Sequence, residues 1–329
     1  MLTRDKLTIH ALLMIGAFFM TFPFVWMVLT SLKDRREVLH SDIVVPHTRT
    51  YVTVDFGFVK RDIEVEVLKR EENGWLVRHV AGASYGRKEV VPPERVITKK
   101  FHVENYKTAW NRGETGREVT FSTYMFNSFV TAILCTIGNV VTSLLAAYAF
   151  TFFIFPFKEF LFSILLITMM VPQQVLLVPD FLIVKDLGWY NTYWALFMPW
   201  IAGVFGIFLL RQFFMTLPKD LYEAAMIDGC SRLGFLFRIL LPLSIPPIIT
   251  MSISVFLTTW NSLIWPLTVV DKPEFYTIQV GLSFFTNEAG TRWELLMAAS
   301  AISIAPLVIL YFFAQKQFIE GIAQTGIKG

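Results

Sequence analysis

The stretch from Leu217 to Pro242 reads LPKDLYEAAMIDGCSRLGFLFRILLP and lies, with its charges, between long apolar runs. Within it, Leu221, Ala224 and Ala225 fall at positions i, i+3 and i+4, which is the spacing of one helix face. Two of these three side chains are alanine, so the face is narrow. A narrow face of this kind predicts a helix that enters a cleft in a partner protein.

Residues on either side of this helix predict where it ends. Pro218 suits the first helical turn, where an amide hydrogen is not needed, and Gly229 suits a left-handed stop beyond the last turn. Ser231 is placed to cap a second short helix that leads into the next apolar run. We therefore expect two short helices joined by a glycine bend. Glu223 and Asp228 would offer negative charges to basic residues of the partner.

The chain as a whole is apolar. Of its 329 residues, 54% are hydrophobic and 17% are charged, whereas about 25% of the residues of a soluble protein are charged. More than half of the 29 basic and 26 acidic residues lie between Leu32 and Arg117, which leaves long uncharged runs elsewhere. Such runs are typical of a helical membrane protein, because lipid cannot hydrogen-bond an exposed backbone.

Six uncharged runs are long enough to cross a bilayer core, which takes about 20 helical residues. They are Ile9–Ser31, Tyr124–Phe150, Phe160–Pro179, Leu187–Leu210, Ile239–Val270 and Leu295–Gln315. The second and fifth exceed one crossing, so tilt, a kink or a flanking interfacial helix must use the extra length. We expect kinks at Pro246 and Pro247 in the fifth run and at Pro306 in the sixth. The fold predicted is therefore an all-α polytopic membrane protein with six transmembrane helices.

The basic residues of the chain ends and short loops predict the orientation. Nine lie on one side, namely Arg4, Lys6, Lys158, Arg211, Lys219, Arg232, Arg238, Lys316 and Lys328. Three lie on the other side, namely Lys185, Lys272 and Arg292. The positive-inside rule then places both termini in the cytoplasm. The charged 32–117 stretch would lie outside, where its length exempts it from the count.

Within the charged stretch the periodicity changes from that of a helix to that of a strand. Tyr51–Phe56 and Ile63–Val67 alternate apolar and polar residues, and Asn73-Gly74 followed by Trp75–Val77 is a strand–turn–strand signature. Three or four short strands would form a small sheet or barrel with one buried face, at about residues 47–100. This β-rich insertion is either a structural cap or a contact surface for an external partner.

These features divide the chain into four parts. They are residues 1–31 with the N-terminus and the first span, the 32–117 extracytoplasmic loop with the insertion, the 118–316 transmembrane core with its cytoplasmic loop at 217–242, and the 317–329 cytoplasmic tail.

Several classes of site lack support. Cys135 and Cys230 show no CxxC spacing and the five histidines are scattered, so we expect neither a disulfide framework nor a metal site. The net charge of +3 is too mixed in sign for a nucleic-acid surface. The sequence has no P-loop, so we expect no bound cofactor and no ATP hydrolysis by this chain alone. A secondary carrier or membrane enzyme would need an acidic, histidine or metal cluster in its spans, but the six runs contain no Asp, Glu, Lys or Arg.

The quoted stretch resembles a known motif. Glu223-Ala224-Ala225, Gly229 and Ile239-Leu240-Leu241-Pro242 match the full EAA–x3–G–x9–I–x–L–P pattern of permease subunits of binding-protein-dependent ABC importers. Other segments are similar to the smaller sugar-importer permease of the maltose-transporter type. These are Thr30-Ser31-Leu32-Lys33, Glu104-Asn105-Tyr106, Asn127-Ser128, Trp260-Asn261, Trp265-Pro266 and the tail Gly326-Ile327-Lys328-Gly329. The resemblance covers nearly the whole chain except roughly His47 to Lys100.

This resemblance implies the type I ABC importer architecture in the cytoplasmic (inner) membrane of a bacterium or archaeon. It implies a second, usually non-identical permease, two copies of a cytoplasmic ATPase that carry ATP and Mg, and an extracytoplasmic solute-binding protein. ATP-driven closure of the ATPase would switch the pore between inward- and outward-facing states. The ATPase-coupling residues would be Glu223, Ala224, Ala225, Asp228, Gly229 and Pro242. Sugars or oligosaccharides fit this subfamily best, and a glycerol-phosphate-type solute or a polyol is the alternative.

Polar residues inside spans are costly and indicate function by default. The residues expected along the pore and substrate path are Asn127, Gln173, Gln174, Trp260, Asn261 and Trp265, with Asn139 and Ser262 as further polar residues in the spans. Aromatic faces with hydrogen-bonding groups beside them are how proteins hold sugars. Two structural alternatives stay open, because tryptophans also form interfacial belts and asparagines also join helices. In the maltose relatives the sugar site belongs mostly to the partner permease.

Overall fold

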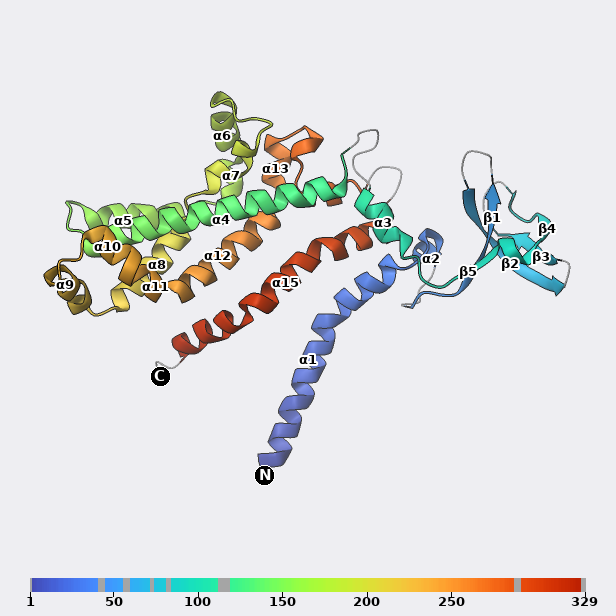
Figure 1. The fold of residues 1–329 in the computed structure, drawn as a ribbon, viewed down its shortest axis with the longest axis horizontal. Helices are drawn as coiled ribbons and strands as arrows, with labels where there is room; N and C mark the ends of the chain where they lie inside the picture. The colour runs from blue at the N-terminus through green and yellow to red at the C-terminus, as the bar shows by residue number, and fades with distance from the viewer. Residues whose placement is uncertain are drawn as a thin grey trace. The chain divides into compact units, whose positions relative to one another are not determined.

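Figure 1 shows the computed structural model of the chain. It describes residues 2–40, 45–55, 60–71, 74–80, 84–111, 119–286 and 291–326. These residues form two compact units. Unit 1 comprises Met1–Trp110 with Phe285–Ile302, and unit 2 comprises Asn111–Phe284 with Ser303–Gly329.

Unit 1 begins with the long helix α1 (Leu2–Ser31), followed by the short α2 (Arg35–His40). Within Lys6–Ser31, the most apolar window of 18 residues has a mean hydropathy of 2.2 and no buried side chain. An apolar helix without a buried face suits lipid or a membrane partner, not water. The first predicted span is confirmed as a helix of this kind.

Helix α3 (Glu104–Asn111) is fastened to the end of α1. The Asn105 side-chain amide donates to the carbonyl oxygens of Ser31 (2.8 Å) and Lys33 (2.9 Å). The Tyr106 hydroxyl lies 2.8 Å from the Ser31 hydroxyl. These bonds satisfy carbonyls that the helix end leaves free. They also bring the start and the end of the inserted segment together.

Between α1 and α3 lies a five-stranded antiparallel sheet of order β4-β3-β2-β1-β5, which we call the β module (residues 47–100). Its strands are β1 (Arg49–Asp55), β2 (Lys60–Glu71), β3 (Gly74–His79), β4 (Lys88–Val91) and β5 (Val96–Lys99), with a 3-10 turn, η2 (Pro93–Arg95), before the last. The predicted β-rich insertion is confirmed, with five described strands instead of three or four.

The β module has an apolar core of its own. Val52, Val65, Val77 and Val91 come from four different strands and are buried together. Val65, Val77 and Val91 alternate with less buried neighbours, as the period of two in the sequence requires. Val52 is preceded by Tyr51, which is also buried. Gly74 opens β3 with a φ of +152°, and a Cβ there would lie 2.7 Å from a Val90 methyl carbon. Asn73, the first residue of the predicted Asn-Gly turn, lies outside the described residues.

Tyr51 ties the module to the segment that leads into α3. Its hydroxyl lies 3.1 Å from His102 Nε2, and burial raises the pKa of Tyr51 well above its usual range. The phenol therefore stays protonated, and a hydrogen bond joins it to this nitrogen. The other ring nitrogen of His102 faces Glu104 Oε1 at 3.2 Å. The contacts of His102 with Tyr51 and Glu104 therefore connect β1 to the segment that leads into α3.

Unit 2 is helical. Its elements are α4 (Phe121–Phe152), α5 (Lys158–Thr168), α6 (Gln173–Asp186), α7 (Tyr193–Phe197), η3 (Met198–Trp200), α8 (Val204–Thr216), α9 (Lys219–Ile227), α10 (Arg232–Phe235), the π-helical turn η4 (Leu236–Leu240), α11 (Leu241–Leu243), α12 (Ile245–Trp260), α13 (Ile264–Val269), η5 (Pro273–Phe275) and α14 (Ile278–Ser283). The last helix, α15 (Trp293–Gly326), begins in unit 1 and continues into unit 2.

The described residues contain four helices able to span a membrane and two bent pairs, up to six spans in all. The third predicted run, Phe160–Pro179, is bent by 100° between α5 and α6. Pro172 explains the break, because proline disfavours a helical conformation in the residue before it. The fifth run is bent by 78° just before Pro246, as predicted. Pro306, where we expected a kink, lies inside the continuous helix α15.

Helix α4 is the centre of unit 2 and packs against α8 and α12. Gly206 of α8 lets these helices approach closely, since a Cβ there would lie 2.3 Å from both Ser143 Oγ and Met251 Sδ. Close packing through small residues is how membrane helices associate. In the predicted fourth run, Leu187–Leu210, residues 201–203 interrupt the helix between η3 and α8, although Tyr193–Thr216 as a whole is long and apolar enough for one span.

Side chains of α4 satisfy the backbone at this interruption. Asn139 donates to the carbonyl oxygen of Trp200 (3.4 Å) and Thr142 to that of Ile201 (2.8 Å). Irregular backbone at membrane depth is tolerated where neighbouring protein groups pair with it. Asn139 and Thr142 of α4 therefore have a structural role, in addition to any role in function.

Candidate functional site

Helix α9 ends as the sequence predicts. Gly229 adopts a φ of +79° in open space. The amide of Cys230 donates to the Ala225 carbonyl (2.9 Å), and that of Gly229 donates to the Met226 carbonyl (3.1 Å). These two bonds form a Schellman motif, which satisfies the last carbonyls of the helix. The predicted left-handed stop is confirmed.

The next helix begins as expected. The Ser231 hydroxyl accepts a hydrogen bond from the Gly234 amide at 3.0 Å, so the predicted cap of α10 is confirmed. Pro218 lies at the N-cap of α9, one position before the helical turn in which we expected it. The Tyr148 hydroxyl of α4 donates to the Arg232 carbonyl at 2.9 Å, which fixes α10 to the central helix.

The packing of α9 corrects one expectation. Ala225 is only 6% exposed and lies in a cluster with Phe214 and Phe235, against which Leu221 and Tyr222 also pack. The face that carries Leu221 and Ala225 therefore rests on the chain's own core and does not enter a partner. Periodicity alone could not tell which partner an apolar helix face has.

The opposite side of α9 is exposed. Asp220, Glu223, Ala224, Ile227 and Asp228 lie at i, i+3, i+4, i+7 and i+8, and we call them the α9 outer face. Ile227 is 85% exposed. The face has three carboxylates and two apolar side chains, so a basic, partly apolar cleft would complement it. Asp220 and Ile227 were not predicted from the sequence, although counting in steps of three and four from Glu223 would have found both.

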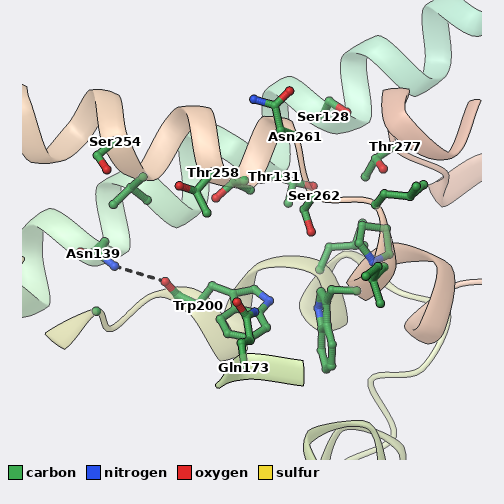
Figure 2. A pocket seen from close by; sticks show the side chains of 18 of the residues that line it. Ser128, Thr131, Asn139, Gln173, Trp200, Ser254, Thr258, Asn261, Ser262 and Thr277 are labelled. Carbon is green, nitrogen blue, oxygen red and sulfur yellow. Dashed lines mark hydrogen bonds between the residues drawn. The ribbon is translucent and has the colours of Figure 1, made fainter. Parts of the chain in front are cut away.

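A second feature of unit 2 is a cavity of about 690 Å³. It is lined from α4, α6, η3, α12, α13 and the start of α14 by Ser128, Thr131, Asn139, Gln173, Gln174, Leu177, Leu196, Trp200, Ala202, Gly203, Phe205, Ser254, Val255, Thr258, Thr259, Asn261, Ser262, Leu263, Ile264, Trp265, Pro266 and Thr277. Figure 2 shows the hydroxyls of Thr131 and Thr258 across the cavity from Gln173 and Trp200. The lining side chains within the described part of the chain are hydroxyls, amides, aromatic rings and aliphatic groups, all neutral.

Four of the six expected pore residues line this cavity: Gln173, Gln174, Asn261 and Trp265. The two glutamines are exposed at the start of α6. The amide of Asn261 donates to the Leu257 carbonyl at 2.8 Å, and its oxygen lies 3.4 Å from the Gln279 amide nitrogen. Trp265 contributes mainly a ring surface, because its Nε1 donates to the Ala195 carbonyl.

The other two expected residues lie outside the cavity lining. Asn127 is fully buried, donates to the carbonyls of Glu274 and Tyr276, and accepts from the Tyr193 hydroxyl. It therefore joins helices, which was the structural alternative. Trp260 is also buried and has its ring stacked on Phe256 and edge-on to Phe129. Its role in the structure is packing.

The sequence analysis missed several lining residues. Trp200 and the hydroxyls of Thr131, Ser254, Thr258 and Thr277 were not singled out, because serine and threonine are common in spans. The spacing of Ser254, Thr258 and Asn261 could have indicated that they share one side of a helix. They fall at i, i+4 and i+7 along α12 and form one polar stripe, which we call the α12 stripe.

With this geometry in place, comparison with known proteins identifies the family. A family model for the binding-protein-dependent transport system inner membrane component matches residues 138–324. The chain belongs to this family. As a member, it is an integral membrane permease subunit of a binding-protein-dependent ABC importer.

Relatives of this permease span several solutes. It is 40% identical over 236 residues to the probable ABC transporter permease protein YurM of Bacillus subtilis, covering 71% of this chain and 76% of that one. It is 34% identical over 249 residues to the sn-glycerol-3-phosphate transport system permease protein UgpE of Brucella abortus, covering 75% and 88%. It is 35% identical over 207 residues to the arabinooligosaccharides transport system permease protein AraQ of Halalkalibacterium halodurans, covering 63% and 74%.

A solved structure shares the fold. A chain of a bacterial ABC transporter involved in the import of the acidic polysaccharide alginate superposes with a TM-score of 0.69 at 17% identity, covering 95% of this chain and 96% of that one. The type I importer architecture predicted from the sequence is thereby confirmed.

Proposed function

We propose that this permease is driven by a separate ATPase that docks on the α9 outer face, and that it imports a neutral carbohydrate. The observation that carries the first half is the division of α9 into two faces. Ala225 fixes one face to the core, while Glu223, Ile227 and Asp228 are exposed on the other. A helix held rigidly on its inner face can transmit a push applied to its outer face.

The chemistry of the outer face defines the docking partner. Its carboxylates would pair with Arg or Lys in the partner's cleft, and Ile227 would pack against an apolar surface inside that cleft. Buried apolar anchors carry most of the energy of an interface, while exposed rim charges set orientation and association rate. We therefore assign Ile227 the larger share of the affinity. In this proposal α9 and both termini lie in the cytoplasm, where ATP and Mg bind to two copies of the ATPase.

The substrate class rests on the cavity. Hydroxyl, amide and tryptophan groups suit the hydroxyls and apolar faces of sugar rings, and AraQ is a permease for arabinooligosaccharides by name. A glycerol-phosphate solute is the second candidate, since UgpE is a permease for sn-glycerol-3-phosphate by name. One observation favours it, because the N-terminus of α6 opens at the cavity with Gln173, and helix N-termini attract anions. The neutral lining favours the sugar.

The remaining partners follow from the family's mode of action. We propose a second permease that completes the pore and an extracytoplasmic solute-binding protein that delivers solute. The β module, which has its own core and returns to the end of α1, would contact this binding protein. The membrane would be the cytoplasmic membrane of a bacterium or archaeon.

The test of the docking assignment is charge reversal in the assembled importer. Glu223→Lys with Asp228→Lys should lower the amount of ATPase that co-purifies with the permease and abolish uptake in proteoliposomes. Asp186→Lys, an exposed acid at the end of α6, is the matched control and should change neither. If the double variant co-purified the ATPase and took up solute at wild-type levels, the assignment of α9 as the ATPase-docking surface would be wrong.

A further inference from the structure

Several hydroxyl side chains in the helices of unit 2 bond to their own helix. Thr136 and Thr151 of α4, Thr250 of α12 and Thr268 of α13 each donate to the carbonyl four residues earlier, at 2.7 to 3.1 Å. This is the ordinary way for a membrane helix to satisfy a hydroxyl.

The hydroxyls of the cavity behave differently. Thr131 and Thr277 are each 4% exposed, and their buried Oγ1 atoms have no hydrogen-bond partner within the described residues. Thr277 even occupies the N-cap position of α14 without capping the helix. A buried polar group without a partner costs about 1–3 kcal/mol. A solute bound in the cavity would supply the missing partner and offset this cost.

The α12 stripe presents further free hydroxyls to the same cavity. Ser254 and Thr258 are exposed, line the cavity and lack a hydrogen-bond partner in the described part of the chain. Neither follows the back-bonding of Thr250 on the same helix. Figure 2 shows Thr258 and Thr131, which both line the cavity. The cavity therefore carries hydroxyls from two facing helices, α4 and α12.

An aromatic platform faces these hydroxyls. The half-buried ring of Trp200 lies edge-to-face with Trp265, at 5.4 Å between centroids and 89° between planes. Trp265 is held by its bond to the Ala195 carbonyl, so it keeps Trp200 in one orientation. The cavity volume of about 690 Å³ falls in the range of small-molecule sites, which runs from about 300 to 1,000 Å³.

We propose that this cavity is a solute-contact site of the permease chain itself, at which one ring of a neutral oligosaccharide rests against Trp200 and hydrogen-bonds to Thr131, Thr258 and Thr277. This inference rests on the proposed carbohydrate function and adds that the present subunit, as well as any partner permease, binds the solute. Thr258 is exposed to the cavity as it stands, whereas the Oγ1 atoms of Thr131 and Thr277 are buried just beneath the lining. In this proposal, rotation of these two side chains brings their hydroxyls to the solute.

The first experiment asks whether the cavity is open and sugar-binding in the assembled importer. Thr258→Cys is made in a Cys135→Ala, Cys230→Ser background, and the introduced thiol is labelled with a membrane-impermeant methanethiosulfonate. Arabinotriose, presented by the solute-binding protein, should slow labelling about tenfold, and sn-glycerol-3-phosphate should not. An unlabelled thiol, equal labelling with and without arabinotriose, or protection only by the phosphate would overturn the proposal.

The second experiment separates contact from a structural role. Thr131→Val with Thr277→Val should leave the thermal midpoint of the complex unchanged or raised, because an unpaired buried hydroxyl is replaced by a methyl group of the same shape. The same pair should reduce arabinotriose uptake about tenfold, the effect of one or two lost hydrogen bonds. Thr250→Val, outside the cavity lining, should leave uptake at the wild-type rate.

Lower uptake at an unchanged midpoint, restored by Thr131→Ser with Thr277→Ser, supports solute contact. Unchanged uptake in the valine pair overturns it, as does a loss that tracks a lower midpoint and is not restored by serine. Failure of the ATPase proposal would be seen separately, as unchanged ATPase co-purification in the α9 charge-reversal variant.

Discussion

Substitutions at Gly229, in the bend after α9, can separate the effect of backbone conformation from the effect of side-chain size. Gly229 has a φ of +79°, and a Cβ built there meets nothing within 4 Å. Substitution therefore causes no clash, and the whole cost comes from the left-handed backbone, about 1–2 kcal/mol for a residue with a Cβ. This corresponds to a drop of roughly fivefold to thirtyfold in the population of the capped bend relative to alternatives.

The substitution series is Gly229→Asn, Gly229→Ala and Gly229→Gln. Alanine and glutamine should impair coupling equally, since the site is open and both pay the same backbone strain, while asparagine should impair it least because it tolerates φ > 0. The assay is uptake per ATP hydrolysed in proteoliposomes, together with ATPase co-purification. A loss that grows with side-chain volume, with glutamine far worse than alanine, would refute the conformational argument and indicate a closely packed partner at this bend.

Three further outcomes are expected. Deleting residues 47–100 should spare assembly with the ATPase and weaken uptake at low solute concentration, because the module's core is its own; unchanged uptake kinetics would exclude a role in delivery. Gly206→Ala should lower the thermal midpoint of the complex, since the new Cβ would lie 2.3 Å from Met251 Sδ and overpacking costs about 1–3 kcal/mol; a midpoint equal to wild type would contradict the helix packing. Glu159→Gln should destabilise more than Arg211→Met, because the glutamate is exposed whereas the arginine it pairs with is buried and would lose its counter-charge; the same thermal measurement checks the order.

The sequence predicts those features that depend on neighbouring residues. The stop at Gly229 and the cap at Ser231 follow from backbone rules that act over four or five residues, and the structure has both. The bend before Pro246 follows in the same way. Pro172 carried an equal signal for the break between α5 and α6, but the long apolar run around it favoured an unbroken span.

The sequence could not show toward which neighbours each side chain points. Ala224 and Ala225 are adjacent and identical in type, yet one is exposed and the other is buried against Phe214. Asn127 and Asn261 are both amides in spans, yet one joins helices and the other borders the cavity. Side-chain chemistry says what a group can bind, whereas the tertiary contacts decide what it meets.

The chain path between the two functional surfaces supports a mechanical connection. From the α9 outer face the chain runs through α10 and the π-helical turn to Ser244, whose buried hydroxyl donates to the Leu240 carbonyl at 2.6 Å, and there enters α12. The hydroxyls of Ser254 and Thr258 lie further along that same helix. If the ATPase docks on the α9 outer face as proposed, a displacement of α9 would reach the cavity wall through one continuous segment, with its bend at Ser244. Because the central helix α4 holds the hydroxyl of Thr131, movement of α12 against α4 would then change the distance between two of the proposed contact groups.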